Sequence, residues 1–409
     1  MIKIENINLA QCLDEGSQAE IHLINDAAVV WEKDLIVWVG KKDHLPQQYQ
    51  KIETIDGKHS LLLPGLIDCH THLSFGGWRS AEFGERVAGV PYSEITKRGG
   101  GISSTVKATR EANEEDLYVR SARFLQKMRS LGVTTVECKS GYGLSLKDEI
   151  KLLKVYKRLS ISQPSRIVST FLGAHLVPKE STREDYCKLV TDTMIPEVAK
   201  SELAEFCDIF IDDHAFSIDE ARPIVAKAKE CGLKIKLHVD QLSSGGGAEF
   251  AAECGATSAD HLEYISEQGI GAIKHSSTVA VSLPLATLYT FQKPLDARAL
   301  IDAGVDVALA TDFNPGSAPS YHMPLTMMLG CTLNRMSPAE VLKAVTIKAA
   351  KALSKNDIIG SIEVGKKADF VLINTPSIEH WMYHFSDNAN RLTVINGEIV
   401  YKAIKESLR

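Results

Sequence analysis

"LIDCHTHLSFGGWRS", residues 66–80, carries an apolar run directly onto two histidines that stand one residue apart, His70 and His72. Residues i and i+2 of a strand point to the same side, so these two imidazoles can face one ion. Two buried imidazoles without partners are costly in a strand. A His-x-His pair alone is also compatible with packed structural histidines, because short motifs recur by chance. The choice between a structural pair and a metal site therefore depends on the residues that the fold places beside it.

The stretch begins a region in which short apolar runs alternate with helical patterns. Eight such runs occur, at residues 65–72, 133–141, 166–175, 206–214, 233–241, 257–264, 277–284 and 305–313. Helical patterns separate several of them, as at residues 111–132 and 218–232. Near-continuous apolar strands that alternate with helices predict a parallel sheet covered on both faces. Eight units favour an α/β fold, a TIM-like (β/α)8 barrel. An open doubly wound sheet is the alternative, but no G-x-G-x-x-G motif follows the first run.

Both ends of the chain differ from this middle region. Residues 2–10 ("IKIENINLA") and 27–40 ("AAVVWEKDLIVWVG") are typical of short strands, as are residues 368–375 and 392–402. Within the last of these, an Asn-Gly pair predicts a tight hairpin turn. We therefore expect a small β-sandwich domain built from both termini, residues 1–63 and 357–409, beside a barrel domain of residues 64–356.

Composition excludes several classes of protein. The 409 residues carry a net charge of −6 from 46 basic and 52 acidic side chains, which argues against a nucleic-acid partner. The sequence contains no run of about 18 apolar residues, so we predict no membrane span. The N-terminus lacks the apolar core of a signal peptide. The eight cysteines are scattered and form no C-x-x-C pair, and a chain this long does not need a disulfide framework. A reducing compartment is therefore favoured, and we expect the protein in the cytoplasm.

Polar residues stand at the carboxyl ends of seven of the eight runs. In chain order they are His70 and His72, Lys139 and Tyr142, His175, Asp212 to His214, His238 and Gln241, His261 and Glu263, and Asp312 and Asn314. The carboxyl ends of barrel strands converge on one mouth, where active sites lie. Each residue alone is weak support, but packing gives no reason for their shared position. The sequence therefore predicts an active site at this mouth.

Two of these residues extend the histidine pair into a set of metal ligands. His238 and Asp312 also end strands, and three imidazoles with one carboxylate suit Zn²⁺, with iron or another borderline ion as alternatives. Asp312 can touch both the metal and an attacking water and is the candidate base. His261 can bind a developing oxyanion or instead orient a ligand. Arg79 can grip a substrate carboxylate, although arginines are more often solvated.

These residues resemble the amidohydrolase superfamily. "DCHTH" on the first strand, histidines on strands five and six, and an aspartate on strand eight carry the resemblance, together with "SLLLPGLIDCHTH" and "GSIEVGKKADFVLI". Within the superfamily the chain is similar to the imidazolonepropionase family. That similarity rests on "HTHLSFGGWRSAEFGERVAGVPYSEI", "GGGISSTVKATREA", "VECKSGYGL", "STFLGAH", "HVDQLSSGGGAE", "SADHLEY" and "ATDFNPGSAPS".

The resemblance implies a metal-dependent hydrolase of histidine degradation, which opens the cyclic amide of 4-imidazolone-5-propanoate to N-formimidoyl-L-glutamate. It implies one metal ion, Zn²⁺ or Fe³⁺ with zinc favoured, bound by His70, His72, His238 and Asp312. His261 matches the histidine of strand six. The substrate contacts implied are Arg79, Tyr142, His175, Gln241, Asn314, Gly316 and Ser317. Barrel enzymes of this kind often form homodimers, although no stretch here indicates an interface.

The chain departs from the family pattern at three places. Gln241 stands where some relatives have Glu, and because an amide cannot shuttle a proton we assign it to binding alone. Asp212, Asp213 and His214 follow the fourth strand instead of the lysine that bridges two metals in binuclear relatives, which favours one metal. Ser317 stands where some relatives have Thr and keeps the hydroxyl. The alternatives are another cyclic-amide hydrolase, an amidine deaminase, and a metal-binding scaffold without activity.

Overall fold

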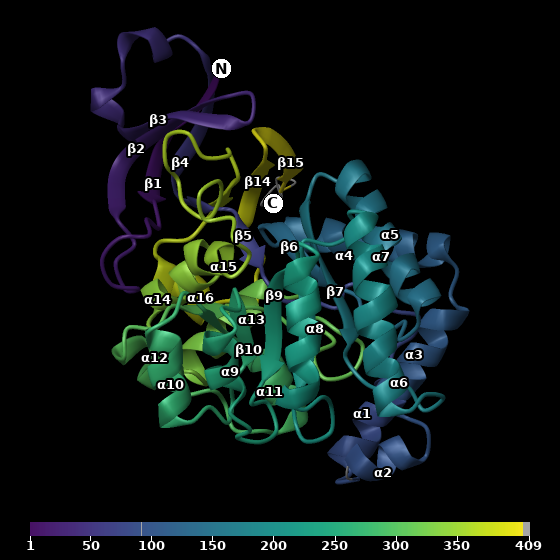
Figure 1. Ribbon diagram of the computed structural model, residues 1–409. Helices are drawn as coiled ribbons and strands as arrows, with labels where there is room; N and C mark the ends of the chain where they lie inside the picture. The colour runs from purple at the N-terminus through teal and green to yellow at the C-terminus, as the bar shows by residue number, and fades with distance from the viewer. Residues whose placement is uncertain (91, 404–409) are drawn as a thin grey trace.

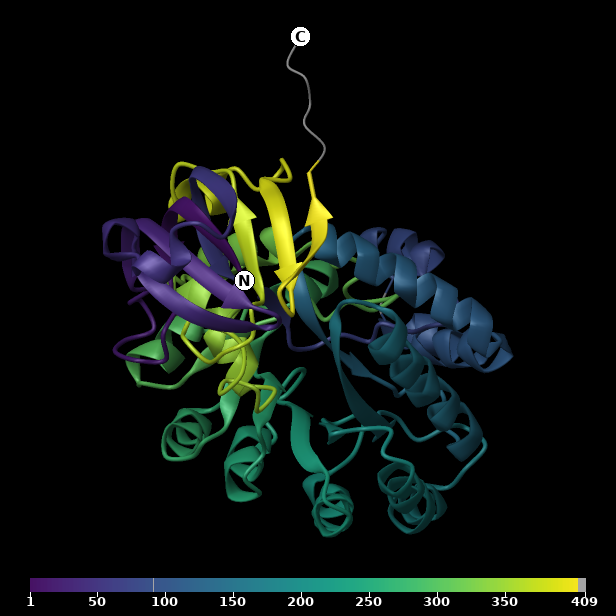
Figure 2. The ribbon, with the colours of Figure 1, turned by 90° about the horizontal axis from the view of Figure 1, so that it is seen from above.

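The computed structural model describes residues 1–90 and 92–403 and places the middle of the chain in an eight-stranded parallel barrel (Figures 1 and 2). Its strands follow one another in chain order around the sheet. They are β5 (Leu66–Asp68), β6 (Val133–Lys139), β7 (Arg166–Ala174), β8 (Phe206–Ile211), β9 (Lys234–Val239), β10 (Ser258–His261), β11 (Val279–Ser282) and β12 (Val307–Leu309). Each of the eight predicted runs contains one of these strands, so the barrel prediction is confirmed.

The barrel closes just beyond the ends of its first and last strands. We predicted His70 and His72 on a strand, but β5 ends at Asp68. The β5–β6 ladder ends at the Asp68–Val136 pair, and on the other side the Asp68 carboxylate, not the backbone, accepts the Thr311 N–H at 3.0 Å. Backbone pairing resumes just beyond this point, where Asp312 N donates to the His70 carbonyl at 3.1 Å and His72 N to the Phe313 carbonyl at 2.9 Å.

Helices cover the outer side of the barrel (Figure 2). In chain order the α-helices of the described residues are α1 (Ser80–Val87), α2 (Tyr92–Lys97), α3 (Ile102–Glu111), α4 (Glu114–Ser130), α5 (Leu146–Ser162), α6 (Arg183–Leu189), α7 (Ile195–Lys200), α8 (Ile218–Glu230), α9 (Gly247–Glu253), α10 (Glu267–Lys274), α11 (Pro284–Thr290), α12 (Ala297–Asp302), α13 (Met323–Thr332), α14 (Pro338–Ala344), α15 (Ile347–Lys351) and α16 (Ile378–Tyr383). Of these, α1 and α2 lie beyond one end of the barrel (Figure 1). The helical patterns at 111–132 and 218–232 correspond to α4 and α8. Among the described residues, none of these helices has the length and apolar character needed to cross a bilayer.

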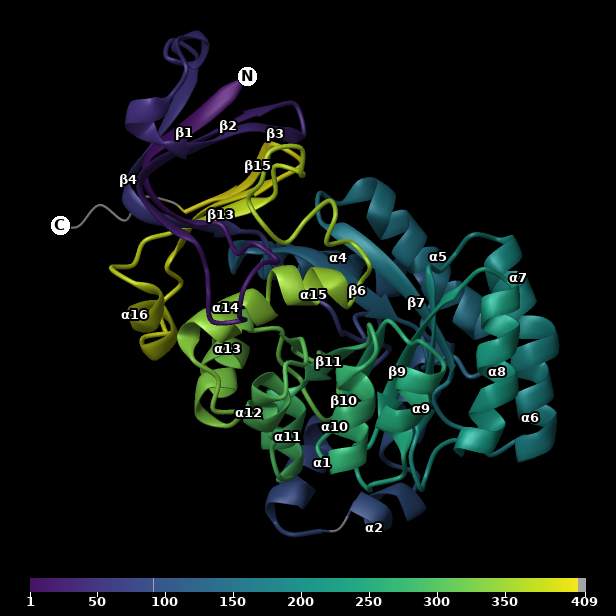
Figure 3. The same ribbon diagram turned by 60° about the vertical axis from the view of Figure 1, so that its left-hand side comes forward.

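The two termini form a separate seven-stranded sheet, as predicted. Its strands are β1 (Ile2–Ala10), β2 (Leu23–Glu32), β3 (Leu35–Lys41), β4 (Glu53–Pro64), β13 (Phe370–Ile373), β14 (Asn390–Ile395) and β15 (Glu398–Lys402). β4 pairs with β1 on one edge and with β13 on the other, so it joins the two ends of the chain. This sheet lies at the end of the barrel opposite α1 and α2 (Figures 1 and 3). The exact domain boundaries stay a prediction, and residues 404–409 and Pro91 of the family motif lie outside the described residues.

The Asn396–Gly397 turn fastens the C-terminal hairpin onto the N-terminal one. Both residues have positive φ, 50° and 79°, as the predicted two-residue turn requires. The Gly397 carbonyl accepts the Trp31 indole N–H at 3.0 Å. A Cβ on Gly397 would lie 1.8 Å from the Lys33 carbonyl oxygen. Glycine is therefore needed here for both its backbone conformation and its lack of a side chain.

We expect Gly397→Ala to lower the free energy of unfolding by roughly 2–5 kcal/mol, the sum of positive-φ strain and an overpacked contact. Gly365→Ala is the matched control, since Gly365 also has a positive φ of 91° but no described atom within 4 Å of an added Cβ. It should cost only the strain, about 1–2 kcal/mol. Denaturant unfolding of both variants measures the difference. Equal losses would mean that the contact with Lys33 is unimportant.

Candidate functional site

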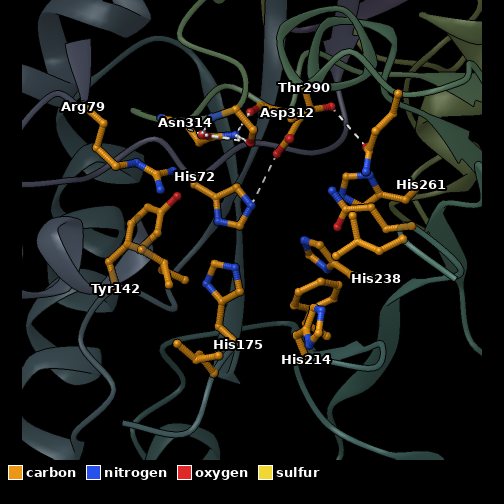
Figure 4. Close-up of a pocket in the computed structure, with 18 of the residues that line it drawn as sticks. His72, Arg79, Tyr142, His175, His214, His238, His261, Thr290, Asp312 and Asn314 are labelled. Carbon is orange, nitrogen blue, oxygen red and sulfur yellow. Dashed lines mark hydrogen bonds and ion pairs between the residues drawn. The ribbon is translucent and has the colours of Figure 1, made fainter. Parts of the chain in front are cut away.

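A cleft of about 740 Å³ opens at the carboxyl ends of the barrel strands. It brings together every predicted site residue except one: His72, Arg79, Tyr142, His175, Gln241, His238, His261, Asp312, Asn314, Gly316 and Ser317. The exception is His70, which is fully buried beside the cleft. Figure 4 shows His72, His238, His261 and Asp312 facing one common space, with Arg79 and Tyr142 beyond His72. Residues from strands far apart in the chain therefore meet at one mouth.

The predicted metal ligands form a compact group. The Oδ1 atom of Asp312 lies 3.4 Å from Nε2 of His70 and 3.5 Å from Nε2 of His72. The ring of His238 is centred 4.5 Å from that of His70. Ligand atoms of His70, His72 and Asp312 all lie within 4.8 Å of one another, and the same holds for His70, His238 and His261. His70 belongs to both groups, which places the four predicted ligands and His261 around one candidate metal centre.

The protonation of these side chains suits a metal. Nδ1 of His70 lies 2.7 Å from Asp260 and Nδ1 of His238 lies 3.0 Å from Asp208. Their Nε2 atoms are buried and have no hydrogen-bond partner among the described residues, which is costly unless an ion binds them. Burial, with nearby Lys139 and His238, lowers the pKa of His70 to about 3 and keeps its lone pair free. These donors fit a divalent or trivalent ion with nitrogen and oxygen ligands.

Asp312 is ionised in this environment. Burial opposes its charge, but the His70 and His72 side chains, whose Nε2 atoms lie 3.4 and 3.5 Å from Oδ1, outweigh burial and hold the pKa of its carboxyl well below the usual range. Its backbone has a φ of 52°, in the left-handed region that is uncommon for residues other than glycine. Strain of this kind persists only where the surroundings enforce it. Here the bond from Asp312 N to the His70 carbonyl fixes the turn, so barrel closure and carboxylate placement depend on one another.

His261 differs from the other histidines of the mouth. Burial opposes its protonation, but Glu263, whose Oε2 lies 3.6 Å from Nδ1, outweighs burial and raises the pKa of His261. A proton and a metal ion compete for an imidazole nitrogen, so this pKa shift acts against His261 as a ligand, although His261 lies in one ligand group with His70 and His238. The φ of His261 is 83°, and this turn lets His261 face the cleft directly after Asp260 has faced the barrel interior.

One wall of the cleft comes from the loop after β6. Glu149 accepts the backbone N–H groups of Gly141, Gly143 and Leu144 at 2.8–2.9 Å, which fixes the loop that carries Tyr142. Nδ1 of His175 lies 3.0 Å from the Gly141 carbonyl, and its ring stacks 5.2 Å from that of His72. Tyr142 and His175 thus form a rigid aromatic surface beside the candidate metal centre.

A second part of the cleft lining carries positive charge. The guanidinium of Arg79 lies over the backbone of Gly316, where an added Cβ would be 1.4 Å from Nη2. Arg86 donates to the Gly316 carbonyl at 2.9 Å. Asn314 uses its amide within its own loop, because its Oδ1 accepts from Gly316 N and Ser317 N at 2.8 Å each. Its position therefore supports a loop-shaping role more directly than a substrate contact.

Sequence reasoning missed the residues behind the ligands. Asp208 and Asp260 contact His238 and His70 from inside the barrel, and Lys139 lies between them. Period-two alternation could have revealed Asp208 and Lys236, because on their strands each stands two residues from a side chain that faces the cleft, Phe210 and His238. Phe210, His214 and Gln292 also line the cleft without having been assigned a role.

Known proteins resemble the chain in both sequence and fold. Residues 61–400 match the amidohydrolase family. The chain is 48% identical to an imidazolonepropionase of Fusobacterium nucleatum subsp. nucleatum over 92% of each chain. It is 46% identical to an imidazolonepropionase of Geobacillus kaustophilus over 95% of this chain and 93% of the relative. In fold it is similar to a 5-methylcytosine deaminase from Klebsiella pneumoniae, with a TM-score of 0.75, 15% identity, and coverage of 100% and 99%.

We expect His238→Ala to weaken zinc binding on the order of a hundredfold or more, because it removes a nitrogen ligand that the remaining side chains cannot replace. His175→Ala is the matched control, since this neighbouring imidazole bonds the Gly141 carbonyl and belongs to neither ligand group. Elemental analysis after dialysis, with chelator competition, measures both. Unchanged metal content in His238→Ala would remove it from the ligand set.

Proposed function

Because the chain belongs to the amidohydrolase family and, within it, to the imidazolonepropionases, we propose that its barrel mouth hydrolyses the ring amide of 4-imidazolone-5-propanoate. The product would be N-formimidoyl-L-glutamate, formed in histidine degradation. The observation that carries the proposal is one cleft that unites His72, His238, Asp312 and an arginine, with His70 buried beside it, in a chain that matches these relatives over nearly its full length.

One metal ion would be held by His70, His72, His238 and Asp312. Zinc is favoured over iron because three neutral imidazoles and one carboxylate are a common zinc ligand set. When bound, such an ion lowers the pKa of a coordinated water and polarises the carbonyl under attack.

Asp312 and His261 would move and balance charge during the attack. Asp312, ionised and facing the cleft, accepts the proton of the attacking water. His261, whose pKa Glu263 raises, donates a hydrogen bond to the oxygen that gains negative charge. The proton that Asp312 accepts is the one the departing ring nitrogen needs, so hydrolysis requires no net proton from solvent.

The walls of the cleft would orient the substrate. Arg79 grips the propionate carboxylate, and Tyr142 and His175 border the ring. Gln241 binds the substrate but does not act as an acid or a base, because its amide neither gains nor loses a proton. Gly316 and Ser317 border the same space, on a loop that Asn314 shapes.

Other expectations from the sequence stay proposals. We expect the protein to act in the cytoplasm, with the terminal domain spanning residues 1–63 and 357–409. A homodimer is the oligomeric state that the family resemblance suggests, and no stretch of this sequence indicates its interface. Size-exclusion chromatography with light scattering tests the dimer directly.

Purified protein should convert 4-imidazolone-5-propanoate, seen as loss of the ring's ultraviolet absorbance. Asp312→Asn should lower turnover by about 10²–10⁴-fold, because the amide cannot accept the water's proton. Asp213→Asn, an exposed residue at the same end of the barrel, is the control and should keep full activity. Turnover of a cyclic amidine or hydantoin without turnover of the imidazolone would support a deaminase or another cyclic-amide hydrolase. Metal binding without any turnover would support the scaffold.

We expect Gly316→Ala to imitate Arg79→Ala, because the added methyl group takes the place of the Arg79 guanidinium. Both changes should raise the KM about 10–100-fold, the loss of a charge-assisted hydrogen bond. Gly77→Ala is the control, since its Cβ would meet only the Ala108 methyl at 3.4 Å. Steady-state kinetics measure all three. An unaltered KM in Arg79→Ala would exclude the carboxylate grip.

A further inference from the structure

A buried lysine lies beneath the candidate metal centre without a role in the proposed chemistry. Lys139 ends β6 and is 0% exposed. Its Nζ donates to Asp208 Oδ2 at 2.7 Å and to Glu137 Oε1 at 2.9 Å, and it lies 3.6 Å from Asp260 Oδ2. All three carboxylates are also 0% exposed. One ammonium group therefore links three buried acids on three different strands.

Two of these acids contact metal-binding histidines. Asp208 reaches Lys139 with Oδ2 and His238 Nδ1 with Oδ1, at 2.7 and 3.0 Å. On the other side, Oδ2 of Asp260 lies 2.7 Å from His70 Nδ1 and 3.6 Å from the same ammonium. Lys139 is thus linked to His238 through one carboxylate and to His70 through another. The Nε2 atoms of these two histidines have no hydrogen-bond partner among the described residues.

The third acid leads to the backbone between the histidine pair. Oε2 of Glu137 accepts the Thr71 N–H at 3.3 Å, and the Glu137 carbonyl accepts the Thr71 hydroxyl at 2.6 Å. The backbone N–H of Lys139 donates to the Thr71 carbonyl at 2.9 Å. Thr71 separates His70 from His72, so this branch fixes the direction in which both rings leave the chain.

The charge of Lys139 explains why this arrangement holds together. Three carboxylates without a cation between them would repel one another inside the barrel, where burial makes unpaired charge costly. With the ammonium in place, Asp208 and Asp260 keep one orientation. Each then holds a hydrogen on Nδ1 of its histidine and directs the Nε2 lone pair toward the mouth.

A second buried lysine provides an internal comparison. Lys236 on β9 lies 3.7 Å from Asp260 Oδ2 and donates to Ser258 Oγ at 2.6 Å and to the Ala352 carbonyl at 3.2 Å. It is equally buried and close to one of the same acids, but among these acids only Asp260 lies within ion-pair distance of it. The two lysines therefore differ in how many histidines they reach.

We propose that Lys139 is a positioning residue for the metal centre, which holds Asp208, Asp260 and Glu137 so that His70 and His238 present their Nε2 atoms to one ion. The proposal rests on the metal site of the proposed function. It predicts that loss of Lys139 lowers metal affinity beyond any effect on folding.

The test compares Lys139→Met with Lys236→Met in the full-length protein. Zinc affinity is measured by chelator competition, and thermal unfolding of the metal-free proteins measures stability. Lys139→Met should weaken zinc binding about 10–100-fold, in the range for residues that support metal ligands. Lys236→Met should change it by less than about threefold, although both variants lose one buried charge. The cobalt-substituted Lys139→Met protein should also show an altered visible absorption spectrum, because the imidazoles no longer hold one orientation.

Equal zinc affinity in Lys139→Met and the unmodified protein would overturn the proposal, as would equal weakening in the two variants, which would indicate a general cost of lost charge. If Lys139→Met does not fold, Lys139→Met/Asp208→Asn removes the ion pair as a unit and is compared with the unmodified protein by the same assay. Unweakened binding there also overturns the proposal. Failure of the unmodified protein to bind zinc, iron or cobalt would instead overturn the metal site itself.

Discussion

The contact between the two ends of the barrel is the constraint on which the site depends. Backbone bonds between His70 and Asp312 and between His72 and Phe313 complete the barrel where β5 and β12 have already ended. The same residues carry three of the four proposed ligands. Closing the barrel and gathering the ligands are thus one structural event. The left-handed backbone of Asp312 is strain that this closure maintains.

Below the mouth, the barrel is not the apolar stack of branched side chains that usually fills such a fold. Glu137, Lys139, Asp208, Lys236 and Asp260 are all buried there and make hydrogen bonds and ion pairs with one another or with nearby polar groups. A polar layer of this kind is favourable only if each charge has its partners. Such a layer tolerates few mutations, but it fixes the arrangement of the groups above it.

The sequence alone predicted the eight strands, the terminal sheet and the gathering of polar residues at one mouth, because period and strand position determine these features. The sequence could not predict the distances between the site residues. Nothing in the local sequence showed that β5 would end at Asp68, or that Asn314 would use its side-chain amide within its own loop. The acids behind His70 and His238 face inward by simple alternation, but which histidine each one meets depends on strand register.

The position of β4 has a consequence for how the chain assembles. β4 runs through Gly65 directly into β5, and its outer edge pairs with β13, more than 300 positions later in the chain. During synthesis on the ribosome, the N-terminal strands and the first barrel strand emerge early, yet this edge has no partner until residues 370–373 have left the exit tunnel. The strand that leads to the histidine pair therefore acquires its final neighbours among the last segments made, so nascent chains that stop short of β13 keep an open sheet edge next to an unfinished barrel.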